Sequence, residues 1–363
     1  MILFISFLIS LFWTGLILVL KARHAHLSND HDVSGPQKFH GLAVPRVGGV
    51  GIFLGVLVAT AIHARAYPEA GRLMLLLVAS SAPVFLSGVV EDLTKRVSVA
   101  WRLLFTVVSP LAAMLILGTA IGRIDVDGLD GLVRVPLVSA LLTVAVVAGV
   151  TQSYNLIDGF NGLASMCVMQ ALIAFAWAAL QTGDDAIRGL SLVVVGATLG
   201  FFVLNYPRGG IFLGDGGAYF LGFVVAEIAL LLIQRNPRIS PMFPVTVCSY
   251  PIFETLFTIY RRRFVHRTPA GRPDALHLHH LVYKRLTRRD YDRRDVHAQR
   301  RRNSTTAPWL WGLSVLPAIA AVRFWNRTPA LLLCMAGFML LYVLVYRRIA
   351  RFGVPRWVTR GWR

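Results

Sequence analysis

A short polar segment, Asn155-Leu-Ile-Asp158-Gly-Phe-Asn161-Gly162, lies between two apolar runs of membrane length, 132–150 and 163–180. It places one carboxylate, two carboxamides and two glycines within eight residues. Carboxylate and amide oxygens are ligands for hard cations such as Mg²⁺, and glycine lets the backbone approach a phosphate closely. An ordinary connector needs only one or two turn-forming residues. The segment therefore predicts a metal or phosphate site, with a solvated connector as the alternative.

Four other groups of polar residues lie at the ends of apolar runs. They are Lys38, His40, Pro45 and Arg46 before Gly48-Gly49; Glu91-Asp92 with Lys95, Arg96 and Arg102; Phe212-Leu-Gly-Asp215; and Asp274, His277, His279 and His280 between Arg272 and Lys284. The first group indicates phosphate binding by basic side chains, with a plain basic loop as the alternative. The acidic pair indicates Mg²⁺ binding or proton acceptance, with a salt-bridged membrane boundary as the alternative.

The last two groups carry an isolated carboxylate and a histidine cluster. Asp215 begins an apolar run that continues to Ile233, and an ionisable residue at a membrane margin is costly unless it has a partner. A hard cation is the expected partner, with Asn155 supplying a second oxygen. Three histidines within four residues resemble part of a zinc site. Their surroundings are basic and no second ligand cluster is evident, so phosphate binding by imidazole and guanidinium is favoured.

Composition indicates which elements must position these residues. Hydrophobic residues make up 56% of the 363 residues and charged residues 15%, and the mean hydropathy is +0.61. These values are typical of a polytopic membrane protein. Apolar runs near the bilayer-crossing length of about 20 residues predict an all-α integral membrane fold with about eleven transmembrane helices in a single domain, 1–363. The runs lie near 2–20, 47–62, 73–90, 103–119, 132–149, 163–180, 189–204, 211–233, 241–260, 308–322 and 328–346. The first lacks a cleavage site and is expected to be a retained helix.

The basic residues predict the orientation of these helices. Of the 37 Lys and Arg residues, 28 fall in loops 21–46, 91–102, 205–210 and 261–307 and in the tail 347–363. Lys and Arg collect in cytoplasmic loops, so these segments are expected inside. The N-terminus is then outside and the C-terminus cytoplasmic. The segment 261–307 is a basic cytoplasmic loop carrying the histidines, and 347–363 is a basic interfacial tail.

Several other functions and features are disfavoured. The net charge of +19 suits anionic lipid headgroups and phosphorylated substrates better than nucleic acid, because the composition already indicates a membrane protein. The three cysteines are dispersed in apolar runs, so no disulfide is expected. Gly51 and Gly55 are expected to allow close helix packing in the membrane rather than to bind a dinucleotide, since no strand precedes them.

The predicted topology places all five polar groups on the cytoplasmic side. Unrelated groups could fall on either side of the membrane, whereas the parts of one site must share a side. The agreement therefore predicts a single site assembled from distant parts of the sequence. A transporter is the alternative of a different class, but its polar residues are expected at mid-membrane or in paired halves, and no internal repeat is evident.

The five groups occur in the order typical of polyprenyl-phosphate N-acetylhexosamine-1-phosphate transferases. The residues that carry the resemblance are Gly48-Gly49, the acidic pair, Asn155-Leu-Ile-Asp158-Gly-Phe-Asn161-Gly-Leu, Phe212-Leu-Gly-Asp215 and His277-Leu-His279-His280. The family includes initiators of bacterial O-antigen and teichoic-acid synthesis and the phospho-MurNAc-pentapeptide translocase. The spaced His-x-His-His resembles the O-antigen branch more than the translocase. That favours a simple UDP-N-acetylhexosamine donor, with the translocase reaction as the nearer alternative.

The resemblance implies transfer of a sugar 1-phosphate from a UDP-N-acetylhexosamine to undecaprenyl phosphate, which releases UMP and starts a lipid-linked surface glycan such as O-antigen. It implies a bacterial inner-membrane enzyme whose active site faces the cytoplasm, compatible with a homodimer. Asp215 and Asn155 would hold Mg²⁺, with Mn²⁺ as an alternative. Catalytic carboxylates would be Glu91, Asp92, Asp158 and Asp215; substrate would contact Lys38, Arg102, Asn161, Phe212, Arg272, His277, His279 and His280.

The acidic pair departs from the family pattern, which usually has Asp-Asp where this chain has Glu91-Asp92. The first carboxylate therefore has no single assured role, although Glu can still bind a cation or accept a proton. A general base is not needed to activate the acceptor phosphate on this interpretation. The second pKa of a phosphate, near ~6, leaves much of that phosphate dianionic at neutral pH. Positioning and charge neutralisation are sufficient on this interpretation.

Overall fold

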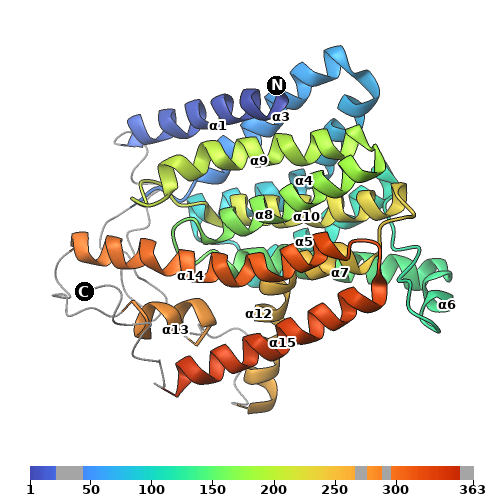
Figure 1. The fold of residues 1–363 in the computed structure, drawn as a ribbon. Coiled ribbons are helices and arrows are strands. Elements are labelled where there is room, and N and C mark those ends of the chain that lie inside the picture. Colours follow the sequence, from blue (N-terminus) through green and yellow to red (C-terminus); the bar gives the residue numbers. More distant parts are fainter. Residues whose placement is uncertain (22–43, 266–275, 288–295, 352–363) are drawn as a thin grey trace.

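The computed structural model describes residues 1–21, 44–265, 276–287 and 296–351, and α-helices dominate them (Figure 1). The helices are α1 (Ile2–Val19), α3 (Gly48–Ala66), α4 (Pro68–Thr94), α5 (Val99–Leu117), α6 (Asp130–Val133), α7 (Pro136–Ile157), α8 (Leu163–Thr182), α9 (Asp185–Asn205), α10 (Gly214–Arg235), α11 (Met242–Val247), α12 (Ser249–Tyr260), α13 (Leu278–Arg285), α14 (Val296–Arg323) and α15 (Thr328–Ala350), with a π-helical turn η1 (Arg261–Val265). Ten of the described helices are long and apolar enough to cross a membrane. The predicted all-α polytopic fold is confirmed; its orientation stays a prediction.

The apolar run 241–260 is helical but does not form the single predicted span. It divides at Cys248 into α11, of six residues, and α12, of twelve. Pro251 explains the division, because proline has no N–H for the carbonyl of Val247 and its ring would clash with that carbonyl. In Figure 1, α12 runs across the direction of the other long helices.

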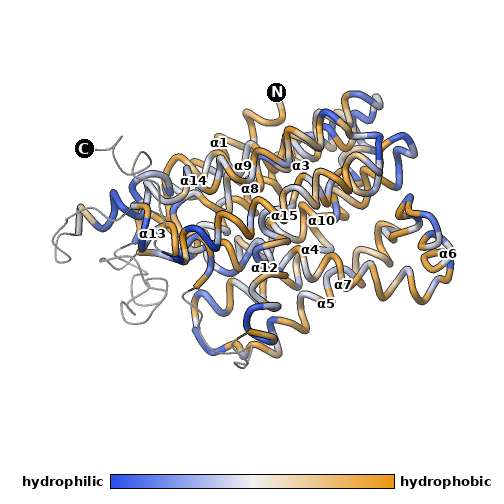
Figure 2. Tube along the Cα trace, turned by 60° about the horizontal axis from the view of Figure 1, so that its bottom comes forward, coloured by the Kyte–Doolittle hydropathy of each residue, from blue (hydrophilic) through white to orange (hydrophobic). Residues whose placement is uncertain are grey.

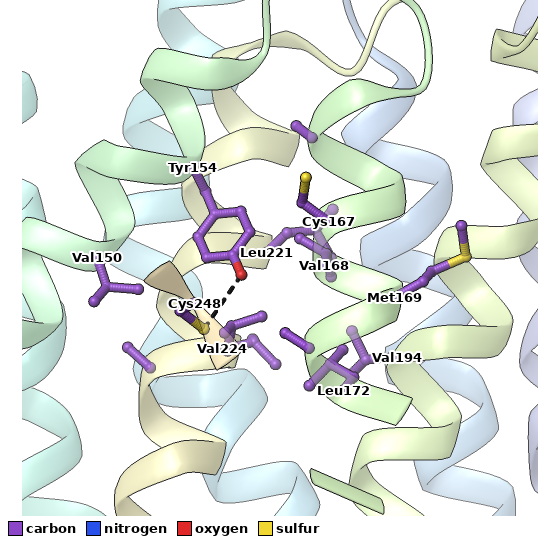
Figure 3. Close-up of a cluster of buried hydrophobic side chains, with 14 of the residues drawn as sticks. Val150, Tyr154, Cys167, Val168, Met169, Leu172, Val194, Leu221, Val224 and Cys248 are labelled. Carbon is purple, nitrogen blue, oxygen red and sulfur yellow. Dashed lines mark hydrogen bonds between the residues drawn. The ribbon is translucent and has the colours of Figure 1, made fainter. Parts of the chain in front are cut away.

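The division between α11 and α12 is buried in the middle of the bundle (Figure 3). Tyr154 of α7 points its hydroxyl at the Cys248 sulfur, 3.5 Å away. Both side chains are almost fully buried, with exposed fractions of 1% and 4%. Apolar side chains such as Val150, Leu172 and Val224 surround them. The contact therefore gives a polar partner to Tyr154 where the helix run is interrupted.

Glycines bring the helices around α10 into close contact. A Cβ atom on Gly49 of α3 would lie 2.3 Å from the Gly217 Cα, and one on Gly88 of α4 would lie 2.4 Å from the Gly216 nitrogen. The first turn of α10 is thus held between the backbones of α3 and α4. The packing predicted for Gly51 is also confirmed, since a Cβ there would lie 2.1 Å from Thr14 Oγ1 of α1.

Hydrophilic residues lie mostly at the ends of the long helices, and hydrophobic residues dominate their middle portions (Figure 2). The short helices α6 and α13 lie at opposite ends of the bundle in Figure 1. His277 precedes α13 and the other two histidines lie in its first turn, whereas Asp130 of the acidic loop begins α6. The fold therefore separates the predicted site from the acidic loop along the length of the bundle.

Candidate functional site

A polar cavity of about 490 Å³ lies at the α13 end of the bundle. Seven of the predicted site residues line it: Asn155, Asp158, Asn161, Phe212, His277, His279 and His280. They come from the ends of α7 and α13 and from the segments that precede α8 and α10. The structure thus assembles the distant motifs into one site, as the sequence predicted.

Asp215 lies beside this cavity, in the first turn of α10. Its carboxylate, 13% exposed, accepts hydrogen bonds from Arg102 Nη1 at 2.8 Å and Arg46 Nη2 at 3.3 Å. Asn155 Nδ2 donates a third, longer bond of 3.5 Å to Asp215 Oδ1. Two guanidinium groups and an amide from three other segments therefore converge on one carboxylate, and the charges of this cluster are paired with one another.

Asp92 of α4 fixes the backbone that carries Asp215. It is 2% exposed, and its two oxygens accept from the backbone N–H groups of Asp215 and Gly216, both at 2.9 Å. A carboxylate at this position satisfies N–H groups at the start of α10 and interacts favourably with the helix dipole. Its catalytic role stays a prediction, and its observed contacts position Asp215.

Glu91 does not share the partners of Asp92. Its Oε2 accepts from the backbone N–H of Val97 at 2.8 Å, in the turn between α4 and α5. Successive helical residues point about 100° apart, so adjacent carboxylates diverge. The two residues of the predicted acidic pair therefore make separate contacts. Asp92 contacts the start of α10, and Glu91 holds the turn that leads to Arg102.

The segment 155–162 connects α7 to α8 through hydrogen bonds to distant residues. The Asn161 N–H donates to Asn303 Oδ1 of α14 at 3.0 Å, and Asn161 Nδ2 donates to the Pro207 carbonyl at 3.4 Å. The Gly162 N–H donates to Asn205 Oδ1 at 2.6 Å. These bonds fix one wall of the cavity, because both Asn205 and Asn303 line it as well.

Phe212 joins the cavity to the segment before α3. Its backbone N–H donates to the Pro45 carbonyl at 2.8 Å, and its carbonyl accepts from the Gly48 N–H at 3.0 Å. The first polar group of the sequence is thus joined to the site by backbone contacts at Pro45 and Gly48, and Arg46 lies close to Asp215. Lys38 and Arg272, two predicted substrate contacts, lie outside the described residues.

The three histidines lie against the segment 155–162. Their ring centroids are 5.2 Å apart for His277 and His279 and 4.3 Å apart for His279 and His280. A Cβ on Gly159 would lie 3.2 Å from His279 Nε2, so this glycine lets the ring approach the backbone. Burial, and secondarily the neighbouring His280 and His277, lowers the pKa of His279 well below its usual value. His279 is therefore a neutral imidazole at physiological pH, able to donate an N–H but not a full charge.

Asp158, which follows the last residue of α7, gives the site a dependence on pH. Burial raises its pKa to about 7, an effect opposed by Arg46 and increased by Asp215. Between its ordinary value of 3.8 and about 7 the folded protein holds a proton that the unfolded chain has lost. Stability therefore falls as the pH rises through this window and levels off above it.

We expect the melting temperature of the metal-free, detergent-solubilised protein, measured relative to that of Asp158→Asn, to fall as the pH rises from about 5 to about 7.5. The amide of Asp158→Asn does not titrate, and the other titrating groups, His279 included, act on both proteins alike. Differential scanning fluorimetry of both proteins in EDTA measures the two slopes. Equal slopes would show that Asp158 does not keep its proton on folding.

Several residues that line the site were not singled out from the sequence, among them Asn205, Thr255 and Asn303. Arg46 was predicted to bind phosphate only as one member of a basic group. Asn205 and Asn303 follow an apolar run and a run of arginines, respectively, and neither belongs to a local motif. Their roles depend on which segments meet in space, so a single sequence provides no signal for them.

An apolar groove of about 840 Å³ begins near the polar cavity and extends along the bundle. It lies between α7, α10, α11 and α12, and its walls include Val146, Leu230, Val245 and Ile259. At its opposite end it reaches Arg123, just before α6. Thr255 of α12 lines both the groove and the polar cavity, so the two spaces adjoin.

Comparison with known proteins agrees with this geometry. The sequence model of glycosyl transferase family 4 matches residues 74–233. A probable undecaprenyl-phosphate N-acetylglucosaminyl 1-phosphate transferase of Bacillus subtilis (strain 168) is 30% identical over 280 residues, covering 77% of this chain and 76% of the relative. A decaprenyl-phosphate N-acetylglucosaminephosphotransferase of Mycolicibacterium smegmatis is 27% identical, covering 76% of this chain and 73% of the relative.

A phospho-N-acetylmuramoyl-pentapeptide-transferase of Streptococcus thermophilus is 40% identical over 86 residues, which cover 24% of this chain and 25% of that protein. The similarity to the first two relatives is thus the more extensive. The family match spans α4 to α10 and includes Asp92, Asn155, Asp158 and Asp215. The site gathers carboxylates, arginines and amides beside an apolar groove in a bundle of membrane-length helices. From these sequence matches we conclude that the chain belongs to glycosyl transferase family 4.

Proposed function

We propose that this protein transfers an N-acetylhexosamine 1-phosphate from a UDP-sugar to undecaprenyl phosphate and releases UMP. The observation that carries the proposal is the junction at Thr255 between the polar cavity beside Asp215 and the apolar groove. Such a junction suits a reaction between a water-soluble nucleotide-sugar and a phosphate on a long hydrocarbon chain. The two relatives that are similar over about three quarters of this chain have names that specify a transfer of this type for those proteins.

The groove is suited to the hydrocarbon chain of the acceptor. Its walls are mostly aliphatic and run from Thr255 toward α6, so a chain seated there would exchange contacts with apolar lipid tails for contacts with apolar side chains. The acceptor phosphate would then lie near Thr255, within the part of the site that contains Arg46 and Asn155. Undecaprenyl phosphate has this combination of a long apolar chain and a single charged head.

The donor fits the polar cavity. Its pyrophosphate requires cationic and N–H donors, which Arg46, Arg102 and the histidines supply. By the family resemblance, Phe212 would stack on uracil and Asn161 would hydrogen-bond to it. Both residues line the cavity. Because the similarity to the pentapeptide transferase covers only 24% of the chain, we favour a simple UDP-N-acetylhexosamine over a peptide-bearing donor.

The donor set beside the cavity is suited to Mg²⁺. Asp215 offers carboxylate oxygens, and Asn155, whose Nδ2 lies 3.5 Å from Asp215 Oδ1, would turn its amide oxygen toward the ion. One or two carboxylates with space for water and substrate phosphates is the usual Mg²⁺ environment. Bound Mg²⁺ would neutralise the pyrophosphate and the charge that grows on departing UMP. Arg46 and Arg102, which contact Asp215 now, would turn toward the substrate phosphates.

The transfer needs little proton chemistry from the protein. An oxygen of the acceptor phosphate forms a bond to the β-phosphorus of the donor, and the bond from that phosphorus to the bridging oxygen breaks to release UMP. With a second pKa near ~6, the acceptor phosphate is largely dianionic at neutral pH and requires no general base. The side chains then act by positioning and by charge neutralisation.

The proposed reaction also implies which membrane holds the protein and which side the site faces. The nucleotide-sugar is cytosolic, so the polar cavity would face the cytoplasm, in agreement with the basic loops of the predicted topology. The bacterial inner membrane is the corresponding location. The product would start a lipid-linked surface glycan, of which O-antigen is one example.

The test is to incubate purified protein with undecaprenyl phosphate, Mg²⁺ and a panel of UDP-N-acetylhexosamines beside UDP-MurNAc-pentapeptide. We expect release of UMP together with a lipid-linked product from one of the simple donors. We also expect EDTA to abolish turnover and excess Mg²⁺ to restore it. Product from the peptide donor alone would favour the translocase reaction, and absence of UMP with every donor would refute the proposed function.

A further inference from the structure

Glu254 of α12 is a fully buried carboxylate to which the proposed reaction gives no role. Its exposed fraction is 0%. Its Oε1 lies 3.3 Å from His277 Nδ1 and accepts from the backbone N–H of Leu278 at 3.1 Å. Its Oε2 accepts from the hydroxyl of Tyr342 on α15 at 2.7 Å. A buried carboxylate is expensive unless it is well partnered, and here both oxygens have partners.

Two partners of Glu254, His277 and Leu278, belong to the histidine motif itself. His277 precedes α13, and the Leu278 N–H belongs to the first turn of that helix. Thr258, one turn further along α12, lies 3.1 Å from the same His277 nitrogen. The carboxylate thus contacts the backbone and the first side chain of the motif, while all three histidines line the polar cavity.

The same helix forms part of the apolar groove. Ile252, Thr255, Leu256 and Ile259 line the groove, whereas Glu254 and Thr258 face the histidine motif. One face of α12 therefore contacts the space suited to the acceptor chain, and another fixes the groups suited to the donor. The two substrates would meet in a geometry set by α12.

We propose that Glu254 is a positioning residue, which fastens the motif His277, His279 and His280 to α12 and so holds it at the correct place beside the groove. Tyr342 fixes the carboxylate from the opposite side. The kinetic part of this inference rests on the proposed transferase function, whereas the structural part does not. Loss of Glu254 loosens the start of α13 and displaces the histidines from the cavity.

Two tyrosines provide a matched comparison. Tyr342→Phe removes the hydroxyl that donates to Glu254 Oε2. Tyr250→Phe removes another fully buried hydroxyl one turn before Glu254 on α12. The Tyr250 hydroxyl has no hydrogen-bond partner among the described residues. The two substitutions delete the same atom from equally buried rings, and only the first breaks a bond to the carboxylate.

The experiment combines transfer kinetics with hydrogen exchange of the peptide 276–286, which contains the Leu278 amide. For Glu254→Ala we expect faster exchange and a kcat about 100-fold lower, with the donor KM changed less than about fivefold, because the motif is misplaced rather than removed. Glu254→Gln keeps one acceptor oxygen, so its kcat should be about tenfold higher than that of Glu254→Ala. Tyr342→Phe should lower kcat by about three- to tenfold, and Tyr250→Phe should leave it unchanged.

Unchanged exchange and kinetics in folded Glu254→Ala would overturn the inference, as would equal losses in Tyr250→Phe and Tyr342→Phe. If the alanine variant does not fold, the glutamine and phenylalanine variants decide the question by the same comparison. Failure of the wild-type protein to release UMP would count against the proposed function instead. Faster exchange in the Glu254 variants would then still support the positioning role.

Discussion

Asp215→Asn is expected to lower kcat/KM for sugar-phosphate transfer by about 10³-fold or more, measured as UMP release at saturating Mg²⁺. The carboxylate is the meeting point of Arg46, Arg102 and Asn155. The amide keeps nearly the same shape but removes the negative charge that holds the two guanidinium groups and that the proposed Mg²⁺ would require. Both the arrangement of the guanidinium groups and the proposed metal affinity would therefore be lost together.

The control for this substitution is Asp185→Asn. Asp185 also lies in the first turn of a long helix and pairs with an arginine, Arg188, at 2.8 Å, but its side chain is 78% exposed. An exposed ion pair of this kind contributes little, about 0–1 kcal/mol. Turnover and melting temperature should therefore match the wild type. If Asp215→Asn kept more than a tenth of the wild-type kcat/KM, Asp215 could not be the metal-binding carboxylate.

The helices and the composition of the site could be predicted from the sequence because both depend on local patterns. Apolar runs of bilayer length give the spans directly. The basic loops placed the polar groups together at one end, and the cavity contains seven of the predicted residues. The prediction was weaker at Pro251, where an apolar run concealed a break that divides one span into α11 and α12.

The contacts within the site could not be predicted, because they join residues that are far apart in the sequence. Glu91 and Asp92 looked like one acidic pair, yet the turn of the helix directs them to Val97 and to the start of α10. Glu254 lies in an apolar run 23 positions before His277, and the structure shows their contact. The break at Cys248 also creates one wall of the apolar groove, which hydropathy alone could not reveal.

Gly214→Ala should also lower turnover strongly, although no functional group is removed. Gly214 has φ of +77°, a conformation that costs a non-glycine residue about 1–2 kcal/mol. A Cβ there would lie 1.9 Å from the Arg46 carbonyl and 2.5 Å from Asp92 Oδ2. Relief of these clashes must move either the backbone that carries Arg46 or the carboxylate that holds the Asp215 N–H. We therefore expect kcat to fall by about 10²-fold, the effect of misplacing a reacting group by about 1 Å, together with a lower melting temperature.

Gly312→Ala separates this effect from the general consequence of adding a methyl group. Gly312 lies within α14, and a Cβ there would have no heavy atom within 4 Å. Alanine in a helix interior is about 0.5–1 kcal/mol more favourable than glycine, so its melting temperature should stay equal or rise while turnover is unchanged. Both substitutions add one methyl group, but we expect Gly214→Ala to lower the melting temperature and Gly312→Ala to leave it equal or raise it. Wild-type turnover in Gly214→Ala would mean that the Asp92 contact does not set the position of Asp215, and that the carboxylate reaches its working geometry only when substrate binds.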